Sequence, residues 1–335
     1  MKSGATAQDV AALAGVSQSA VSRTFTHGAS VSPAMRARVL AAAQTLGYRP
    51  NAMARSLITR QTRIIALGVH YLDNQFYPQV IEELSQRLQQ QGYHLLLFTG
   101  EAGQHNADAG LSEILQYQVD GIVLASSTLS PALARSCAAA GVPVVLLNRV
   151  AQIGSKPLHG TSTVTADNRS AGQLVAQYLV QKGYRSIAYL AGLDNASTSI
   201  ERERGLREGL HKARLCLHSR SCGHYSFAGA QVAMRQLLAQ PERPNAVFVA
   251  NDHMAIAAMD VIRTEHGLRV PQDIAVVGFD NIPQAAWGSY QLTTVLQDVG
   301  RMVQACIDLL LEQMQGTVRS RHITVPCQLV ARHSA

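Results

Sequence analysis

Four polar side chains near the N-terminus, Gln18, Ser19, Ser22 and Arg23, are the residues best suited to a specific chemistry, the recognition of another molecule by hydrogen bonds. With apolar Val21 among them, they predict a helix that turns its polar face away from a core. Glutamine can bond adenine, arginine can bond guanine, and serine can bond base edges or phosphate. The set therefore suits the reading of DNA, although an ordinary three-helix bundle with a polar outer face would show the same pattern.

A second polar group lies much further along the chain, where predicted strands end. Asn251 and Asp252 follow one such strand, and Asp280 follows the next. A carboxylate at such a place can accept two hydroxyl hydrogen bonds, as a sugar demands. Helix N-capping explains Asn251 and Asp252 equally well, and a simple turn explains Asp280, so the residue types alone leave this choice open.

The positive charge of the chain is concentrated at its N-terminal end. Of the 29 lysines and arginines, eight lie in residues 1–63, whereas only one of the 22 acidic residues, Asp9, lies there. The remaining 21 bases and 21 acids cancel, so the whole net charge of +7 belongs to this segment. Unless the terminus is basic by chance, it indicates a polyanionic partner such as DNA.

Three short helices within residues 1–50 must position the N-terminal polar group. Thr6 and Asp9 predict a capping box for the first helix, and Ser17 and Ser32 are the predicted N-caps of the second and third. The expected helix ends are Gly15 and Gly47, and the expected buried positions are Val10, Ala11, Leu13, Ala14, Val21, Val39, Leu40, Ala43 and Leu46. Two helices joined by a tight glycine turn are typical of the helix-turn-helix motif.

The rest of the chain alternates short aliphatic runs with amphipathic helical stretches. The predicted strands are 64–69, 94–98, 121–125 and 143–147 in a first set, and 186–190, 246–249 and 274–277 in a second. This alternation predicts parallel sheets with helices on both faces. Two sets of strands predict two subdomains, with a ligand site in the cleft between them, at the carboxyl ends of the strands.

Composition and motifs restrict the class of protein. With 335 residues, 47% of them hydrophobic, the chain can form two or three folded units. No apolar run approaches the roughly 20 residues needed to cross a bilayer, and no signal peptide is recognisable, which favours a cytoplasmic protein. The five cysteines lack disulfide or metal-site spacing, and no common catalytic motif occurs. We therefore expect no metal, no cofactor and no enzymatic activity.

The N-terminal stretch DVAALAGVSQSAVSRTF, followed by VSPAMRARVLAAAQTLGYRPNAMARSL, resembles the DNA-binding head of the lactose-repressor (LacI/GalR) family. The resemblance implies that this head binds an operator half-site. It also implies a hinge helix within residues 51–62, in which Leu57 inserts as an apolar wedge into the minor groove of the DNA. The alternative role for Leu57 is packing against the body of the protein. Family positions that touch DNA match Thr6, Gln18, Ser19, Arg23, Ser32, Asn51 and Ala54, and we add Ser17, Ser22 and Thr26 as candidate contacts. Many members carry asparagine in place of Thr26, so the sequence departs from the family pattern at that contact.

Three later stretches, VTADNRSAGQLVAQYLVQKGYRSIAYLAG, FVANDHMAIAAMDVIRTEHGLRVPQDIAVVGFDN and LTTVLQD, look like landmarks of the same family, whose body also resembles periplasmic sugar-binding proteins. The implied fold is an all-α helix-turn-helix head, residues 1–50, and an α/β periplasmic-binding-protein-like body of two doubly wound parallel-sheet subdomains. The expected first subdomain comprises 63–162 with 292–321, and the second comprises 163–291 with 322–335.

The resemblance also assigns residues to the cleft. Arg202 matches a family arginine that anchors the effector, although alone it would belong to a solvated run of charges. Phe76 matches the aromatic residue of a common N-P-F segment, in which Gln75 here replaces the proline. We expect Tyr225 to stack on a sugar face unless it only packs its loop, and Arg149 to recognise a carboxylate or phosphate. Asn251, Asp252 and Asp280 complete the predicted effector site.

These observations predict a homodimeric transcription regulator, in the first place a repressor, that binds near-palindromic double-stranded operator DNA. A small molecule in the cleft, a sugar or a sugar acid, is expected to control its operator affinity, and the purine-sensing relatives leave the identity of the effector open. The alternative is a soluble sugar-binding receptor without DNA function. The basic head and the lack of a recognisable signal peptide count against that receptor.

Overall fold

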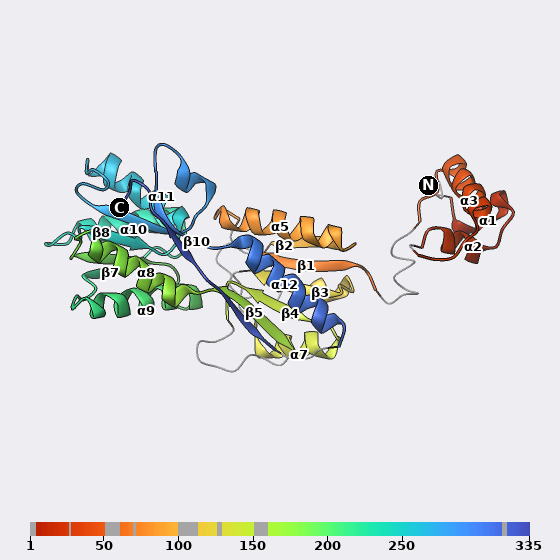
Figure 1. Cartoon of the computed structure of the whole chain (residues 1–335), viewed down its shortest axis with the longest axis horizontal. Coiled ribbons are helices and arrows are strands. Elements are labelled where there is room, and N and C mark those ends of the chain that lie inside the picture. Colours follow the sequence, from red (N-terminus) through yellow and green to blue (C-terminus); the bar gives the residue numbers. More distant parts are fainter. Residues whose placement is uncertain are drawn as a thin grey trace. The chain divides into compact units, whose positions relative to one another are not determined.

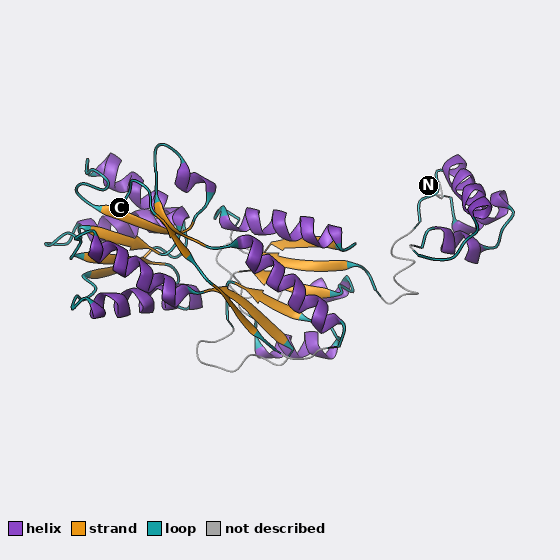
Figure 2. Ribbon diagram, viewed as in Figure 1, coloured by secondary structure: helices purple, strands orange, loops and turns teal. Residues whose placement is uncertain are grey.

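The computed structural model of the protein describes residues 5–26, 28–50, 61–69, 72–99, 113–125, 129–150, 160–316 and 320–335. The chain divides into two units, Met1–Thr62 and Arg63–Ala335, called here the head and the body. Figure 1 and Figure 2 show a helical head and a body of sheets and helices. The predicted hinge positions Asn51, Ala54 and Leu57 lie outside the described residues.

The head consists of helices α1 (Ala7–Ala14), α2 (Gln18–Thr24) and α3 (Pro33–Leu46). The predicted capping box is confirmed, since the hydroxyl of Thr6 accepts from the backbone N–H of Asp9 and the Asp9 carboxylate accepts from the backbone N–H of Thr6. The hydroxyls of Ser17 and Ser32 cap α2 and α3 as predicted. Each of these caps satisfies a backbone donor that a helix start would otherwise leave without a partner.

A small core of alanine and valine side chains holds the head together. Val10, Val21 and Val39, one from each helix, are completely buried. The predicted burial of Leu13, Leu40 and Leu46 is wrong, because these side chains are 55%, 45% and 37% exposed. The residues that do pack against this small core are Ala7, Val16, Phe25, Met35 and Tyr48.

The body contains two six-stranded sheets, one in each of two lobes. The first lobe holds β1 (Ile64–Val69), β2 (His94–Thr99), β3 (Gly121–Ala125), β4 (Val144–Leu147), β5 (Thr161–Ala166) and β11 (His322–Val325) in the order β11-β5-β4-β3-β1-β2. All its strand pairs are parallel. The second lobe holds β6 (Ile187–Ala191), β7 (Ser219–Cys222), β8 (Ala246–Val249), β9 (Ala275–Asp280), β10 (Thr293–Leu296) and β12 (Gln328–Val330) in the order β12-β10-β9-β8-β6-β7. Only β12 runs antiparallel to its neighbour.

Helices cover both sheets (Figure 1). In the first lobe, α5 (Phe76–Gln90) and α12 (Val299–Met314) pack against each other, while α7 (Pro131–Ala139) contributes to a separate hydrophobic cluster on the sheet. The second lobe pairs α8 (Asn168–Gln181) with α9 (Ser197–Lys212), and α10 (Phe227–Leu238) with α11 (Asp252–Asp260). A π-helical turn, Val261–Glu265, continues α11, and a 3-10 turn spans Pro283–Ala286. The strands β1, β3 and β8 have the bounds that the sequence predicts, and the other predicted strands differ by a few residues.

The chain crosses between the lobes three times, after β5, after β10 and after β11. The predicted crossings near residues 162, 291 and 321 lie four or five residues too early, because each of these strands stays in its sheet to its last residue, at Ala166, Leu296 and Val325. After the first two of these strands a helix follows within three residues, since α8 begins at Asn168 and α12 begins at Val299.

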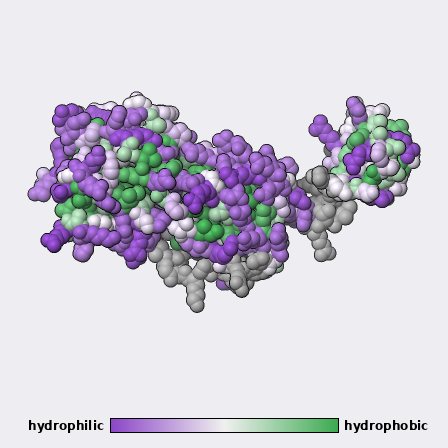
Figure 3. Space-filling view, viewed as in Figure 1, coloured by the Kyte–Doolittle hydropathy of each residue, from purple (hydrophilic) through white to green (hydrophobic). Residues whose placement is uncertain are grey.

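Polar residues cover much of the face of the body seen in Figure 3. No helix of the described residues is long and apolar enough to cross a membrane.

Glycines allow α8 and α9 to approach closely in the second lobe. A Cβ atom on Gly205 would lie 2.0 Å from the backbone oxygen of Arg169, and one on Gly172 would lie 2.3 Å from that of Arg202. Since the neighbours are backbone atoms, a rotamer change cannot relieve the overlap. The glycines therefore fix the position of α9, which carries two residues of the cleft described below.

We expect Gly205→Ala to lower the free energy of unfolding by about 2–3 kcal/mol, because the added methyl group forces the two helices apart. Urea unfolding followed by circular dichroism measures this loss. Gly288→Ala is the matched control, since a Cβ at Gly288 meets no atom within 4 Å. Equal stability of the two variants would refute the role of Gly205.

Candidate functional sites

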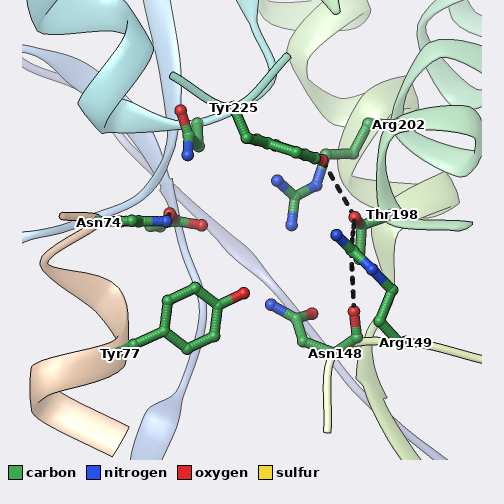
Figure 4. Close-up of a pocket in the computed structure, with 9 residues that line it drawn as sticks. Asn74, Tyr77, Asn148, Arg149, Thr198, Arg202 and Tyr225 are labelled. Carbon is green, nitrogen blue, oxygen red and sulfur yellow. Dashed lines mark hydrogen bonds between the residues drawn. The ribbon is translucent and has the colours of Figure 1, made fainter. Parts of the chain in front are cut away.

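A polar cleft lies between the two lobes of the body (Figure 4). Its lining residues lie near the carboxyl ends of strands or in the first turns of helices, at the edge where the strands of each sheet end. The first lobe contributes Asn74, Tyr77, Asn148 and Arg149, and the second contributes Thr198, Arg202, Tyr225, Asn251 and Asp280. The space between atoms there is about 350 Å³.

Five of the seven predicted effector residues line this cleft: Arg149, Arg202, Tyr225, Asn251 and Asp280. Phe76 does not, because its ring is buried in the core of the first lobe, edge-on to Tyr77 at 5.2 Å between centroids. The next residue along α5, Tyr77, is the aromatic side chain that lines the cleft. Successive side chains on a helix point in directions about 100° apart, and the sequence pattern did not show which of the two neighbouring aromatic residues faces the cleft.

Asp252 also lies away from the lining, in spite of its place beside Asn251. Its carboxylate is completely buried and accepts from the backbone N–H of Ile282 at 2.9 Å and from the hydroxyl of Thr294 at 2.5 Å. Burial, with the nearby charge of Asp280, raises the pKa of Asp252 to about 7. Asp252 therefore ties the loop after β9 to β10. The amide oxygen of Asn251 accepts from the N–H of Met254 at 3.0 Å, so the alternative N-cap role is confirmed for that residue.

Asp280 is the carboxylate of the cleft lining. Its two oxygens accept hydrogen bonds from Asn74 at 3.1 Å and Gln297 at 2.6 Å. Burial raises its pKa to about 6, against the opposing effects of Arg202 and of these two hydrogen bonds. Its φ angle of 124° is rarely adopted by a residue with a side chain, so the surrounding contacts hold its backbone in a strained conformation.

Arg202 is buried, although its neighbours on α9 form surface ion pairs such as Arg204 with Glu208. Its Nε donates to the amide oxygen of Asn168 at 2.8 Å, and its Nη1 donates to the carbonyl of Ala250. Its guanidinium also lies 3.5 Å from the centre of the Phe279 ring. The solvated-face alternative is therefore wrong for Arg202, which is fixed at the cleft wall.

Arg149 links the lobes directly. Its Nη1 donates at 2.6 Å to the hydroxyl of Thr198, which is also 3.0 Å from the hydroxyl of Tyr225. The guanidinium lies 5.7 Å from the centre of the Tyr225 ring. Figure 4 shows this chain of contacts across one side of the cleft.

Sequence reasoning missed four lining residues: Asn74, Tyr77, Asn148 and Thr198. The rule that ligands bind beyond strand ends would have found Asn148, which directly follows β4. Its side-chain oxygen is buried and has no hydrogen-bond partner among the residues that the structure describes. No pattern in the sequence marked Thr198, because only the folded α9 places it opposite Arg149.

The head presents a polar face on α2. Gln18, Ser19, Ser22 and Arg23 are exposed, whereas Val21 is buried on the opposite face. The other described candidates for DNA contact are exposed as well: Thr6, Ser17, Thr26 and Ser32. This arrangement has the geometry of a recognition helix, whose exposed side chains reach base edges in the major groove. The residues that the structure describes contain no cluster of three potential metal ligands.

A helix-turn-helix head joined to a two-lobed body with a polar cleft defines a ligand-controlled DNA-binding regulator of transcription. Residues 6–51 match the bacterial regulatory proteins of the lacI family, and residues 176–335 match a periplasmic binding protein-like domain.

Curated relatives match the chain over almost its whole length. The ribose operon repressor of Escherichia coli K12 is 34% identical over 99% of this chain and 100% of its own. The HTH-type regulator CelR of Thermobifida fusca is 34% identical over 98% of both chains. Among solved structures, a Lac repressor dimer bound to operator and an anti-inducer has a TM-score of 0.85 at 29% identity over 99% of both chains. The chain belongs to the LacI family, and it is a DNA-binding repressor under effector control.

Replacing Asp280 by asparagine tests the electrostatics of the cleft. Because the folded pKa is raised from 3.8 to about 6, the carboxyl group favours folding at low pH, and this contribution is lost as the pH rises through 6. The Asp280→Asn variant should therefore gain stability relative to the wild type between pH 5 and pH 8, by roughly 1 kcal/mol.

Urea unfolding across this pH range measures the difference in the free energy of unfolding between the variant and the wild type. Asp308→Asn, which removes an exposed carboxylate, is the control for the loss of one negative charge. A difference that stays constant with pH would contradict the raised pKa.

Proposed function

We propose that this repressor binds its operator as a homodimer and that a sugar or sugar derivative in the cleft changes its affinity for DNA. The observation that carries the proposal is the convergence of polar side chains from both lobes on one cleft, with Arg149 bonded to Thr198 across it. A ligand that contacts both lobes changes the relative stability of the open and closed arrangements of the body. Control of a distant DNA-binding site requires such a difference in ligand affinity between two arrangements.

The exposed face of α2 supports the DNA-binding roles of Gln18, Ser19, Ser22 and Arg23. Thr6, Ser17, Thr26 and Ser32 are proposed to contact the phosphate backbone or base edges near the ends of the head helices. Asn51, Ala54 and Leu57 are proposed hinge contacts, on the strength of the family resemblance. Two identical heads would read two half-sites, so the operator should be near-palindromic.

The chemistry of the cleft supports a polyhydroxylated effector. Asp280 and the unpartnered oxygen of Asn148 can accept hydroxyl donors, and Tyr225 offers a ring face. Solved relatives include a regulator bound to cellobiose, at a TM-score of 0.74 and 32% identity, over 99% of this chain and 100% of that one. A coupling of about 1–3 kcal/mol between effector and operator is enough for control. The fold permits either sign of this coupling, so both an inducer and a corepressor satisfy the proposal.

Catalysis is not part of the proposal, because the named relatives are regulators of transcription. A regulator that acts on the chromosome works in the cytoplasm, which is the proposed location. A sugar receptor without DNA function is the rival, and the polar face of α2 argues against it.

Operator binding tests the head. We expect Gln18→Ala to weaken binding to a duplex selected from random DNA by about 10- to 100-fold, because one bidentate base contact contributes about 1–3 kcal/mol. Gln44→Ala, an exposed glutamine on α3, is the matched control and should bind like the wild type.

Binding should also weaken steeply as salt rises from about 50 to about 200 mM, because a basic head releases counterions from DNA. Equal losses in both glutamine variants, or a flat salt dependence, would contradict the proposed recognition surface.

A further inference from the structure

The charges of the cleft do not cancel. Arg149 and Arg202 are both buried at its wall, and Asp280 is the one carboxylate among the lining residues. In the part of the chain that the structure describes, no ion pair joins either arginine to an acidic side chain. Two cations facing one anion leave the lining with an excess positive charge.

Neutral groups hold both guanidinium ions. Arg202 donates to an amide oxygen and a carbonyl and stacks on Phe279. Arg149 donates to the hydroxyl of Thr198 and to the carbonyl of Asn148, and it lies over Tyr225. These contacts orient the cations but cancel no charge, and a buried charge without a counter-ion is costly. The energetic benefit of an anion at this place is therefore large.

Arg149 also has donors to spare. A guanidinium carries five N–H groups, and the hydrogen bonds of Arg149 to described residues all use Nη1. Its Nε and Nη2 can form the two parallel hydrogen bonds by which arginine binds a carboxylate or a phosphate. Figure 4 shows Arg149 and Arg202 among the side chains that surround the cleft.

The lining also contains hydrogen-bond acceptors, beside amide and hydroxyl groups that can donate as well. The carboxylate of Asp280 suits hydroxyl donors, and so does the buried side-chain oxygen of Asn148, which has no partner in the described part of the chain. A ligand that satisfies the whole lining carries hydroxyl groups and one negatively charged group.

Resting on the proposed function, we propose that the effector is an acidic sugar derivative, a sugar acid or a sugar phosphate, whose anionic group binds Arg149. The arginine then determines specificity for acidic over neutral sugars, while Asp280 and Asn148 bind hydroxyl groups.

The test compares each neutral sugar with its own acidic derivatives on the full-length protein. The probes are ribose, ribonate and ribose 5-phosphate, together with glucose, gluconate, glucuronate and glucose 6-phosphate, and calorimetry measures their affinities. We expect at least one acidic probe to bind about 100-fold or more tightly than its neutral parent, as a charge-assisted bidentate contact at a buried arginine allows. The carboxylate and phosphate arms distinguish the two sources of the anion.

Variants locate the anion. Arg149→Gln should weaken the preferred acidic probe by at least tenfold while changing the neutral parent little, and Arg149→Lys should retain part of the preference because it keeps the charge. Exposed Arg135→Gln on α7 removes the same charge outside the cleft and should have no effect. If the Arg149→Gln variant folds poorly, the Arg149→Lys variant and the ratio of acidic to neutral affinity in the wild-type protein still test the inference.

Operator affinity with each probe separates this inference from the proposed function. The inference is overturned if a neutral sugar binds as tightly as its acidic derivatives, or if the Arg149→Gln variant keeps the full preference for the acidic probe. In the first case the proposed function still stands, provided that the neutral sugar changes operator affinity. An acidic probe that binds through Arg149 without changing operator affinity supports the inference and counts against the proposed function. Failure of every probe to bind overturns the inference.

Discussion

Parallel strands in a sheet all end at the same edge, and this constraint places almost every functional side chain of the body. Asn148 and Arg149 follow β4, Asn251 follows β8, and Asp280 ends β9. Because the two sheets present these edges to each other, residues more than a hundred positions apart in the sequence line one cleft. The close packing of α8 against α9, which requires glycine at position 205, brings Thr198 and Arg202 to the same place.

The polar groups at this edge depend on one another, because a buried polar group without a partner is costly. Asp252 holds the loop after β9 through the N–H of Ile282, and a Cβ on Gly278 would lie 2.1 Å from its carboxylate. The loop follows directly on Asp280, the last residue of β9, whose backbone is strained. The buried carboxylate of Asp252 thus helps to hold in place the segment that carries Asp280, the carboxylate of the cleft lining.

The sequence predicted local structure well wherever the structure depends on contacts between residues that are close together in the chain. The caps Thr6, Ser17 and Ser32 are of this kind, since a side chain and a backbone N–H three residues away decide them. Prediction was wrong where an outcome depends on other elements. Leu40 has the spacing of a buried helical position, yet the packing of the three head helices leaves it exposed.

The sequence by itself determined the alternation of helices and strands in the body with seven of the strands described there, the predicted helix caps of the head, the basic N-terminal segment and the resemblance to the LacI family. These follow from residue type and spacing along the chain. Only the tertiary structure decided that Tyr77 rather than Phe76 lines the cleft, that Arg202 is buried, and that Arg149 bonds Thr198 across the lobes. The physical reason is that burial and hydrogen bonding between distant segments depend on how helices and sheets pack, and packing is not a property of any single stretch of sequence.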